Sequence, residues 1–118
     1  MPQITVERSA YLDDVDWEEF ALDLHKVVVE TAAAKSEACK TRVLRTEEEV
    51  VGGDKEGHGI VNVTIALLAG RTEETKAKLT EAVVELLRKH VPPRDGVTAL
   101  HLSAEVRDLD ASYTKAVV

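Results

Sequence analysis

The residue with the most distinctive potential chemistry is Pro2, which directly follows Met1. Methionine is normally removed before such a small residue, and we expect its removal to leave Pro2 as the free amino terminus. The nitrogen of an amino-terminal proline is a secondary amine and can act as a base. If Met1 stays attached, the same nitrogen is an amide without basicity. Pro2 is therefore our candidate general base and acid.

Three cations are candidates for holding an anion near that base. Arg71 lies in the Gly70-Arg71-Thr72 turn, just before a predicted helix whose free N–H groups also favour anions. Its guanidinium could hold a carboxylate bidentately. Lys40 and Arg42 share one face of a short predicted strand. Each of these cations could instead be solvated, as edge-strand and turn residues often are.

The remaining reactive side chains give weaker signals. Four histidines show no metal-ligand spacing and no cysteine joins them, namely His25, His58, His90 and His101. Solvation is the favoured interpretation of His58. The neighbours Lys40 and Arg42 could lower the pKa of the Cys39 thiol, but nothing else indicates a thiol enzyme. Because no phosphate-binding loop, Ser-His-Asp pattern or paired carboxylates stand out, we expect neither a metal nor a cofactor.

The elements that must position these residues follow from hydrophobic periodicity. Residues 3–8 begin with polar and apolar side chains in alternation and predict a strand. Asp16 is the predicted N-cap of a helix that ends near Ala34 and has an apolar face at helical spacing. A short strand over 40–46 follows.

The second half of the chain predicts strand, helix and strand again: a strand over 60–68, a helix from Thr72 to His90 and a strand over 97–106. An irregular loop or hairpin over 47–58 precedes these elements, and a tail over 108–118 follows them. The run over 60–68 is almost continuously apolar, which is typical of a central strand covered on both faces. Pro92 and Pro93 stop the helix. The apolar end of the tail could dock on a neighbouring subunit.

Strand, helix and strand occur twice, and a crossover helix joins parallel strands within each half. We therefore predict an α/β fold, a two-layer β-α-β-β-α-β sandwich in which a four-stranded sheet carries both helices on one face. A length of 118 residues fits a single domain over 1–118. The other sheet face would be bare in a monomer, so we expect an oligomer.

Composition limits the partners of the chain. A net charge of −7 argues against nucleic acid and against an anionic membrane surface, so an anionic small molecule would need a local basic site. No apolar run reaches the length of a membrane span, and the first residues do not have the pattern of a signal peptide. One cysteine excludes an internal disulfide framework. We expect a cytoplasmic protein.

Several stretches together resemble the tautomerase superfamily, and within it the 5-carboxymethyl-2-hydroxymuconate Δ-isomerase family. They are the opening Met1-Pro2, the Gly53-Asp54-Lys55 loop through His58, the segment Ile65 to Thr72, the strand Leu102 to Val106, and Tyr113 with Lys115. Pro2 and the Gly70-Arg71 turn are the most specific parts of this similarity.

The resemblance implies a homotrimer with active sites at the amino-terminal proline, near the contacts between subunits. It implies a shift of a double bond in an unsaturated keto acid, without cofactor or metal, in the catabolism of aromatic compounds. It also implies a second basic residue near the start of the second strand, which would be Lys40, with Arg42 as the alternative on the same face. The family has arginine in this region, and lysine offers no planar fork for a carboxylate.

Two other functions stay open from the sequence. The first is a hydratase or dehalogenase that uses the same proline as an acid to activate water. That chemistry needs an additional carboxylate at the site, for which Glu7 and Glu105 are candidates. The second is a trimeric binding protein that keeps the fold without catalysis.

Overall fold

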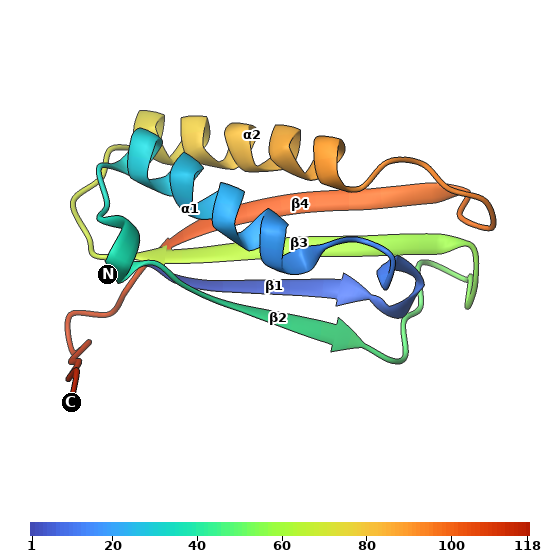
Figure 1. Cartoon of the computed structure of the whole chain (residues 1–118), viewed down its shortest axis with the longest axis horizontal. Coiled ribbons are helices and arrows are strands. Elements are labelled where there is room, and N and C mark those ends of the chain that lie inside the picture. The colour runs from blue at the N-terminus through green and yellow to red at the C-terminus, as the bar shows by residue number, and fades with distance from the viewer.

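A computed structural model describes all 118 residues and contains one sheet and two long helices (Figure 1). The elements are β1 (Gln3–Ser9), α1 (Trp17–Ala32), β2 (Lys40–Thr46), β3 (His58–Leu67), α2 (Glu73–His90) and β4 (Ala99–Asp108), with short 3-10 turns η1 (Ala10–Leu12) and η2 (Ser36–Ala38). The predicted order of strand, helix and strand, repeated once, is confirmed.

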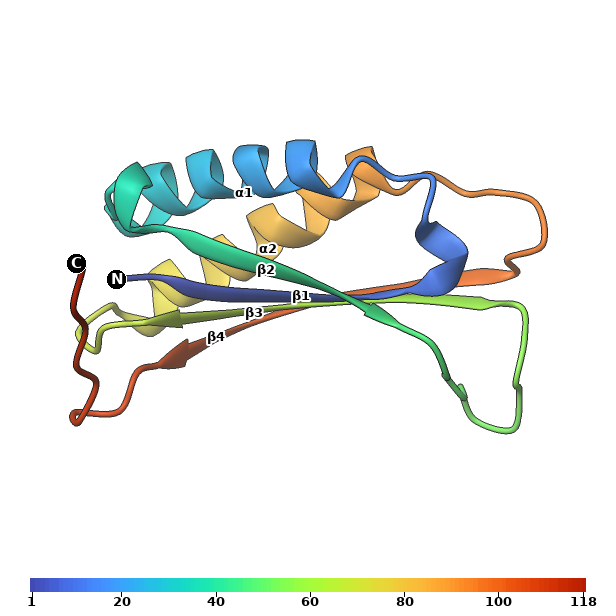
Figure 2. The same cartoon turned by 60° about the horizontal axis from the view of Figure 1, so that its bottom comes forward.

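The four strands form one mixed sheet in the order β2-β1-β3-β4. β1 runs parallel to β2, β3 runs parallel to β4, and the two halves meet through the antiparallel pair of β1 and β3. Both helices lie on the same face of this sheet (Figure 2). The predicted two-layer sandwich is therefore confirmed, and β1 occupies an inner position in the sheet.

Both helices begin at the predicted caps. The side chain of Asp16 accepts a hydrogen bond from the Glu19 amide, and that of Thr72 accepts one from the Thr75 amide, each at 3.1 Å. The first helix ends two residues earlier than expected, because Ala33 takes a left-handed conformation with φ 54°.

The core lies between the sheet and the helices and is almost wholly aliphatic. Every second residue of the two inner strands contributes a side chain to it, as Ile4 and Val6 of β1 do. The inward face of each helix contributes side chains such as Leu24 and Leu79. Trp17 packs in this cluster and donates to the Leu12 carbonyl oxygen at 3.0 Å, so it is a core residue.

The prediction that 60–68 is covered on both faces is wrong for the isolated chain. β3 alternates strictly between buried and half-buried positions, since the helices cover one face only. The half-buried side belongs to the open face of the sheet, where side chains such as Gln3, Thr5, Asn62 and Thr64 are polar. Among the helices, none is long and apolar enough to span a membrane.

Candidate active site

Pro2 occupies a fixed, buried position immediately before the first strand. Its carbonyl oxygen accepts a hydrogen bond from the Lys40 amide at 3.2 Å, which extends the pairing of β1 with β2 by one step. Because β1 lies between β2 and β3, the amino terminus is held where the sheet begins rather than on a free arm. The sequence predicted this placement.

The environment of the amino terminus disfavours a positive charge. Burial lowers the pKa of the Met1 amine, which directly precedes Pro2, and the charges of Arg71, Lys115 and Lys40 lower it further, in that order. Three cations from three different segments therefore converge on one end of the sheet.

Arg71 is anchored by main-chain oxygens. Its Nε and Nη2 donate to the Ala32 carbonyl oxygen at 3.2 and 3.0 Å, and its Nη1 donates to the Leu68 carbonyl oxygen at 3.2 Å. Carbonyl groups do not neutralise its charge, and two of its five N–H donors remain available. A half-buried cation with a fixed orientation suits carboxylate binding better than a solvated turn arginine would.

Lys40 and Arg42 lie on the open face of the sheet, in register with Gln3 and Thr5. Both side chains are exposed, as the predicted strand pattern requires. Lys40 Nζ donates to the Ala38 carbonyl oxygen at 3.1 Å and contributes to the field at the amino terminus. Arg42 lies two residues farther along β2, and its Nη2 donates to Gln3 Oε1 at 2.8 Å.

Lys115 is a cation that the sequence analysis did not single out as a site residue. It lies in the tail after β4, which is at the same end of the sheet as the amino terminus in both views of the fold (Figures 1 and 2). Only the similarity of the Tyr113 and Lys115 stretch pointed to this segment, because a tail without regular structure gives no periodic signal.

The cations of this end are all without an acidic partner. Lys40, Arg42, Arg71 and Lys115 take part in none of the ion pairs of the chain, although carboxylates outnumber cations. Uncompensated positive charge in an acidic protein is the electrostatic pattern of a site for an anion.

Cys39 borders the same end but is a poor nucleophile. Burial raises the pKa of its thiol, and this outweighs the opposing charges of the amino terminus and Lys40. The prediction that neighbouring cations could lower this pKa is therefore wrong in its net direction.

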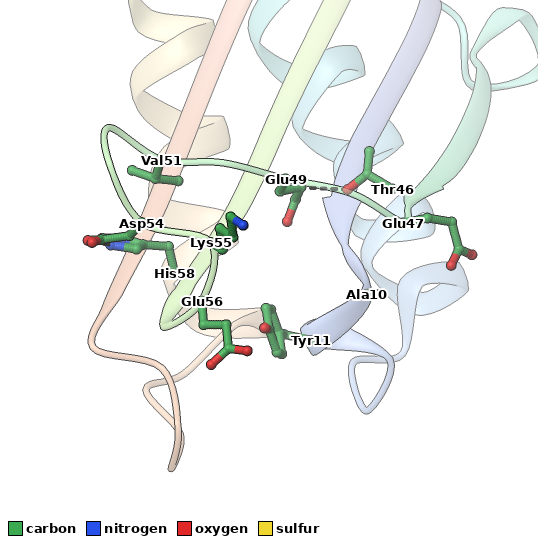
Figure 3. Close-up of a pocket in the computed structure, with 10 residues that line it drawn as sticks. All are labelled: Ala10, Tyr11, Thr46, Glu47, Glu49, Val51, Asp54, Lys55, Glu56 and His58. Atoms are coloured by element: carbon green, nitrogen blue, oxygen red, sulfur yellow. Dashed lines mark hydrogen bonds and ion pairs between the residues drawn. The ribbon is translucent and has the colours of Figure 1, made fainter.

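A hollow of about 260 Å³ lies at the opposite end of the sheet, around the loop before β3 (Figure 3). It is lined by four carboxylates, those of Glu47, Glu49, Asp54 and Glu56, with one lysine. This lining would repel an anionic substrate, so the hollow is not a candidate active site.

His58 borders that hollow and is not simply solvated, contrary to the favoured interpretation. Its Nε2 lies 2.9 Å from Asp54 Oδ2, and its Nδ1 lies 2.9 Å from His101 Nε2. The two ring nitrogens therefore have partners far from Pro2, because β3 begins where β1 ends.

The two candidate carboxylates for activating water lie away from Pro2. Glu7 is five residues farther along the extended β1, a distance of about 16 Å. Glu105 lies on the edge strand β4, where it is paired with Thr64, and it forms an ion pair with Arg107 at 3.0 Å. Neither is in position to act together with Pro2 within one chain.

Comparisons with known proteins identify a family and a shared fold. A family model described as 5-carboxymethyl-2-hydroxymuconate isomerase matches residues 2–116. No curated protein matches the sequence. Among solved structures, a 5-carboxymethyl-2-hydroxymuconate isomerase from Deinococcus radiodurans R1 has 23% identity and a TM-score of 0.84, and the match covers 97% of this chain and 88% of that chain.

Two further structures share the fold. A 5-carboxymethyl-2-hydroxymuconate delta-isomerase has 16% identity and a TM-score of 0.72, with 100% of this chain and 89% of that chain covered. A fused 4-OT described as a wild-type symmetric trimer has 18% identity and a TM-score of 0.76, with 97% and 92% covered. At these identities the structures show a common fold alone.

Proposed function

The chain belongs to the 5-carboxymethyl-2-hydroxymuconate isomerase family and is an isomerase, and we propose that it shifts a double bond in an unsaturated 2-hydroxy or 2-keto polycarboxylate with Pro2 as acid and base. The proposed substrates resemble 5-carboxymethyl-2-hydroxymuconate. The proposal requires that Met1 is removed, so that Pro2 carries a secondary amine.

The proposed reaction is a balanced proton transfer. The neutral Pro2 nitrogen takes the proton from the 2-hydroxyl group of a dienol, and the electron pair moves through the conjugated system as the ketone forms. The protonated Pro2 then returns a proton to a carbon at the other end of that system. Because one group removes and returns the proton, the step needs no cofactor.

The observation that carries this proposal is the set of unpaired cations around a buried amino terminus. Burial and positive charge both favour a neutral amine, which is the form that acts as a base. The same cations would hold the carboxylates of the substrate. We assign Arg71 to one carboxylate and Lys40 to a second, with Arg42 as the alternative second cation.

We further propose that the chain forms a homotrimer and that neighbouring subunits complete the site. The open sheet face is only half covered within one chain, and a structural relative is described as a symmetric trimer. Light scattering coupled to size exclusion measures the mass. A monomer at assay concentrations would contradict this part of the proposal.

Ketonisation of 2-hydroxymuconate, followed by ultraviolet absorbance across pH, tests the function. We expect turnover by a sample whose intact mass shows that Met1 is absent. A rate no faster than buffer with such a sample would rule out the proposed reaction. Release of halide from a haloacrylate would then favour the alternative of a water-activating enzyme.

A further inference from the structure

The segment after β4 folds back across the start of the sheet instead of leaving it. The Leu109 amide donates to the Leu67 carbonyl oxygen at 2.6 Å, which prolongs the pairing of β3 with β4. Asp110 then closes a turn, since its side chain accepts from the Ser112 amide at 2.8 Å and its carbonyl oxygen accepts from the Tyr113 amide at 2.9 Å. The chain therefore turns directly after the last strand and crosses the end of the sheet where β1 begins (Figure 2).

Hydrogen bonds connect the tail after this turn to the inner strand β1. Gln3 Nε2 donates to the Tyr113 hydroxyl oxygen at 3.0 Å, and Gln3 Oε1 accepts from Arg42 Nη2 at 2.8 Å. Tyr113 is half-buried, unlike the residues around it in the tail. Gln3 directly follows Pro2, so this contact fixes the tail one residue away from the candidate base.

Lys115 follows Tyr113 by two residues and is exposed. It has no acidic partner, and it lies close enough to the amino terminus to contribute to the field there together with Arg71 and Lys40. A cation in the tail, apart from Arg71 in the turn before α2, lets the site hold both ends of a dicarboxylate at once.

We propose that the tail from Asp110 to Lys115 is part of the active site and that Lys115 binds a carboxylate of the substrate distant from the reacting hydroxyl group. Tyr113 acts as a positioning residue, because its contact with Gln3 holds the tail in place. The site then selects substrates with at least two carboxylates over monocarboxylates. This inference rests on the proposed function for its substrate class, but its test does not depend on turnover.

Equilibrium binding, measured by calorimetry, tests the role of the tail independently of the proposed reaction. The probes are adipate, an unreactive dicarboxylate of the chain length of muconate, and hexanoate, its monocarboxylate counterpart. Lys115→Gln should weaken adipate binding about tenfold and hexanoate binding less than about twofold, because a charge-assisted contact contributes on that order. Lys115→Arg should restore adipate binding.

Lys89→Gln is the matched control, since Lys89 is also exposed and unpaired but lies at the far end of α2. It should bind both probes as the wild type does. Tyr113→Phe keeps every charge and should weaken adipate binding about threefold without affecting hexanoate. Wild-type adipate affinity in Lys115→Gln, or no adipate binding by the wild type, would overturn the inference.

Turnover by the same samples distinguishes a failure of the proposed reaction from a failure of the proposed tail site. Adipate binding that depends on Lys115 in a protein without isomerase activity would support the tail site and remove the proposed reaction. Turnover of 2-hydroxymuconate with unchanged KM and adipate affinity in Lys115→Gln would keep the reaction and remove the role of the tail.

Discussion

The guanidinium of Arg71 donates two hydrogen bonds to the carbonyl oxygen of Ala32, across 39 residues of sequence. Ala32 is the last residue of α1, where carbonyl groups have no partner within the helix. Arg71 therefore joins the end of α1 to the turn before α2 and keeps its charge at the end of the sheet where Pro2 lies.

This double role leads to a prediction for Arg71. Arg71→Ala should lower kcat/KM at least about 100-fold and lower the free energy of unfolding by about 1–2 kcal/mol, because both the carboxylate contact and the carbonyl contacts are lost. Arg71→Lys should recover part of the activity through its charge. The measurements are steady-state kinetics and urea unfolding. A variant that is less stable but has wild-type KM and kcat would assign Arg71 to structure alone.

Pro2 should be essential for turnover and dispensable for binding. Pro2→Ala should lose about 100-fold or more in kcat, which is the usual contribution of a general acid and base, and should keep its affinity for adipate. Intact mass must show that Met1 is absent from both proteins. For the wild type, kcat/KM should rise with pH through a single ionisation, because Pro2 acts when neutral. The burial and the neighbouring cations that lower the pKa of the Met1 amine act in the same direction on the Pro2 nitrogen once Met1 is removed.

Lys40 and Arg42 can be told apart by the same substitution at each position. Lys40→Ala should raise KM about tenfold with little change in kcat, since its charge acts at the amino terminus. Arg42→Ala should have a smaller effect, because Arg42 is engaged by Gln3. If Arg42→Ala raises KM more than Lys40→Ala does, the second cation of the site is Arg42.

His25 should make the fold sensitive to acid. Its Nε2 lies 2.7 Å from Thr41 Oγ1, and burial lowers its pKa from the usual 6.5. The unfolded chain therefore binds more protons than the folded chain, so this contribution to stability is present above about pH 6.5 and is lost as pH falls through that range. His25→Gln should show a smaller loss of unfolding free energy between about pH 7.5 and about pH 5.5 than the wild type. An identical loss in both proteins would contradict this assignment.

Cys39 should react slowly in the folded protein. Burial raises the pKa of its thiol, and its Sγ lies 3.5 Å from the Lys35 carbonyl oxygen, to which it donates. Labelling by iodoacetamide at about pH 8 should be much slower than in the denatured chain, because little thiolate forms and little surface is exposed. Equal rates in the folded and denatured protein would show that the thiol is accessible.

Local patterns in the sequence determined the elements of this fold. The apolar face of α1, the caps Asp16 and Thr72 and the stop at Pro92 depend on residues a few positions apart, so each can be recognised without a partner in space. The amino-terminal placement of Pro2 and the turn position of Arg71 follow from the same elements. The sequence overestimated the burial of β3, because an apolar run cannot show whether helices of the same chain pack on one face of the strand or on both.

The tertiary structure alone decided which charges meet. Lys40, Arg71 and Lys115 stand in three separate segments, and no spacing along the chain relates them to one another. Their convergence depends on the parallel pairing of β1 with β2, on the anchoring of Arg71 at Ala32, and on the turn of the chain after β4. Electrostatic interactions act through space, and so the sequence could supply the candidate base while the fold had to supply its surroundings.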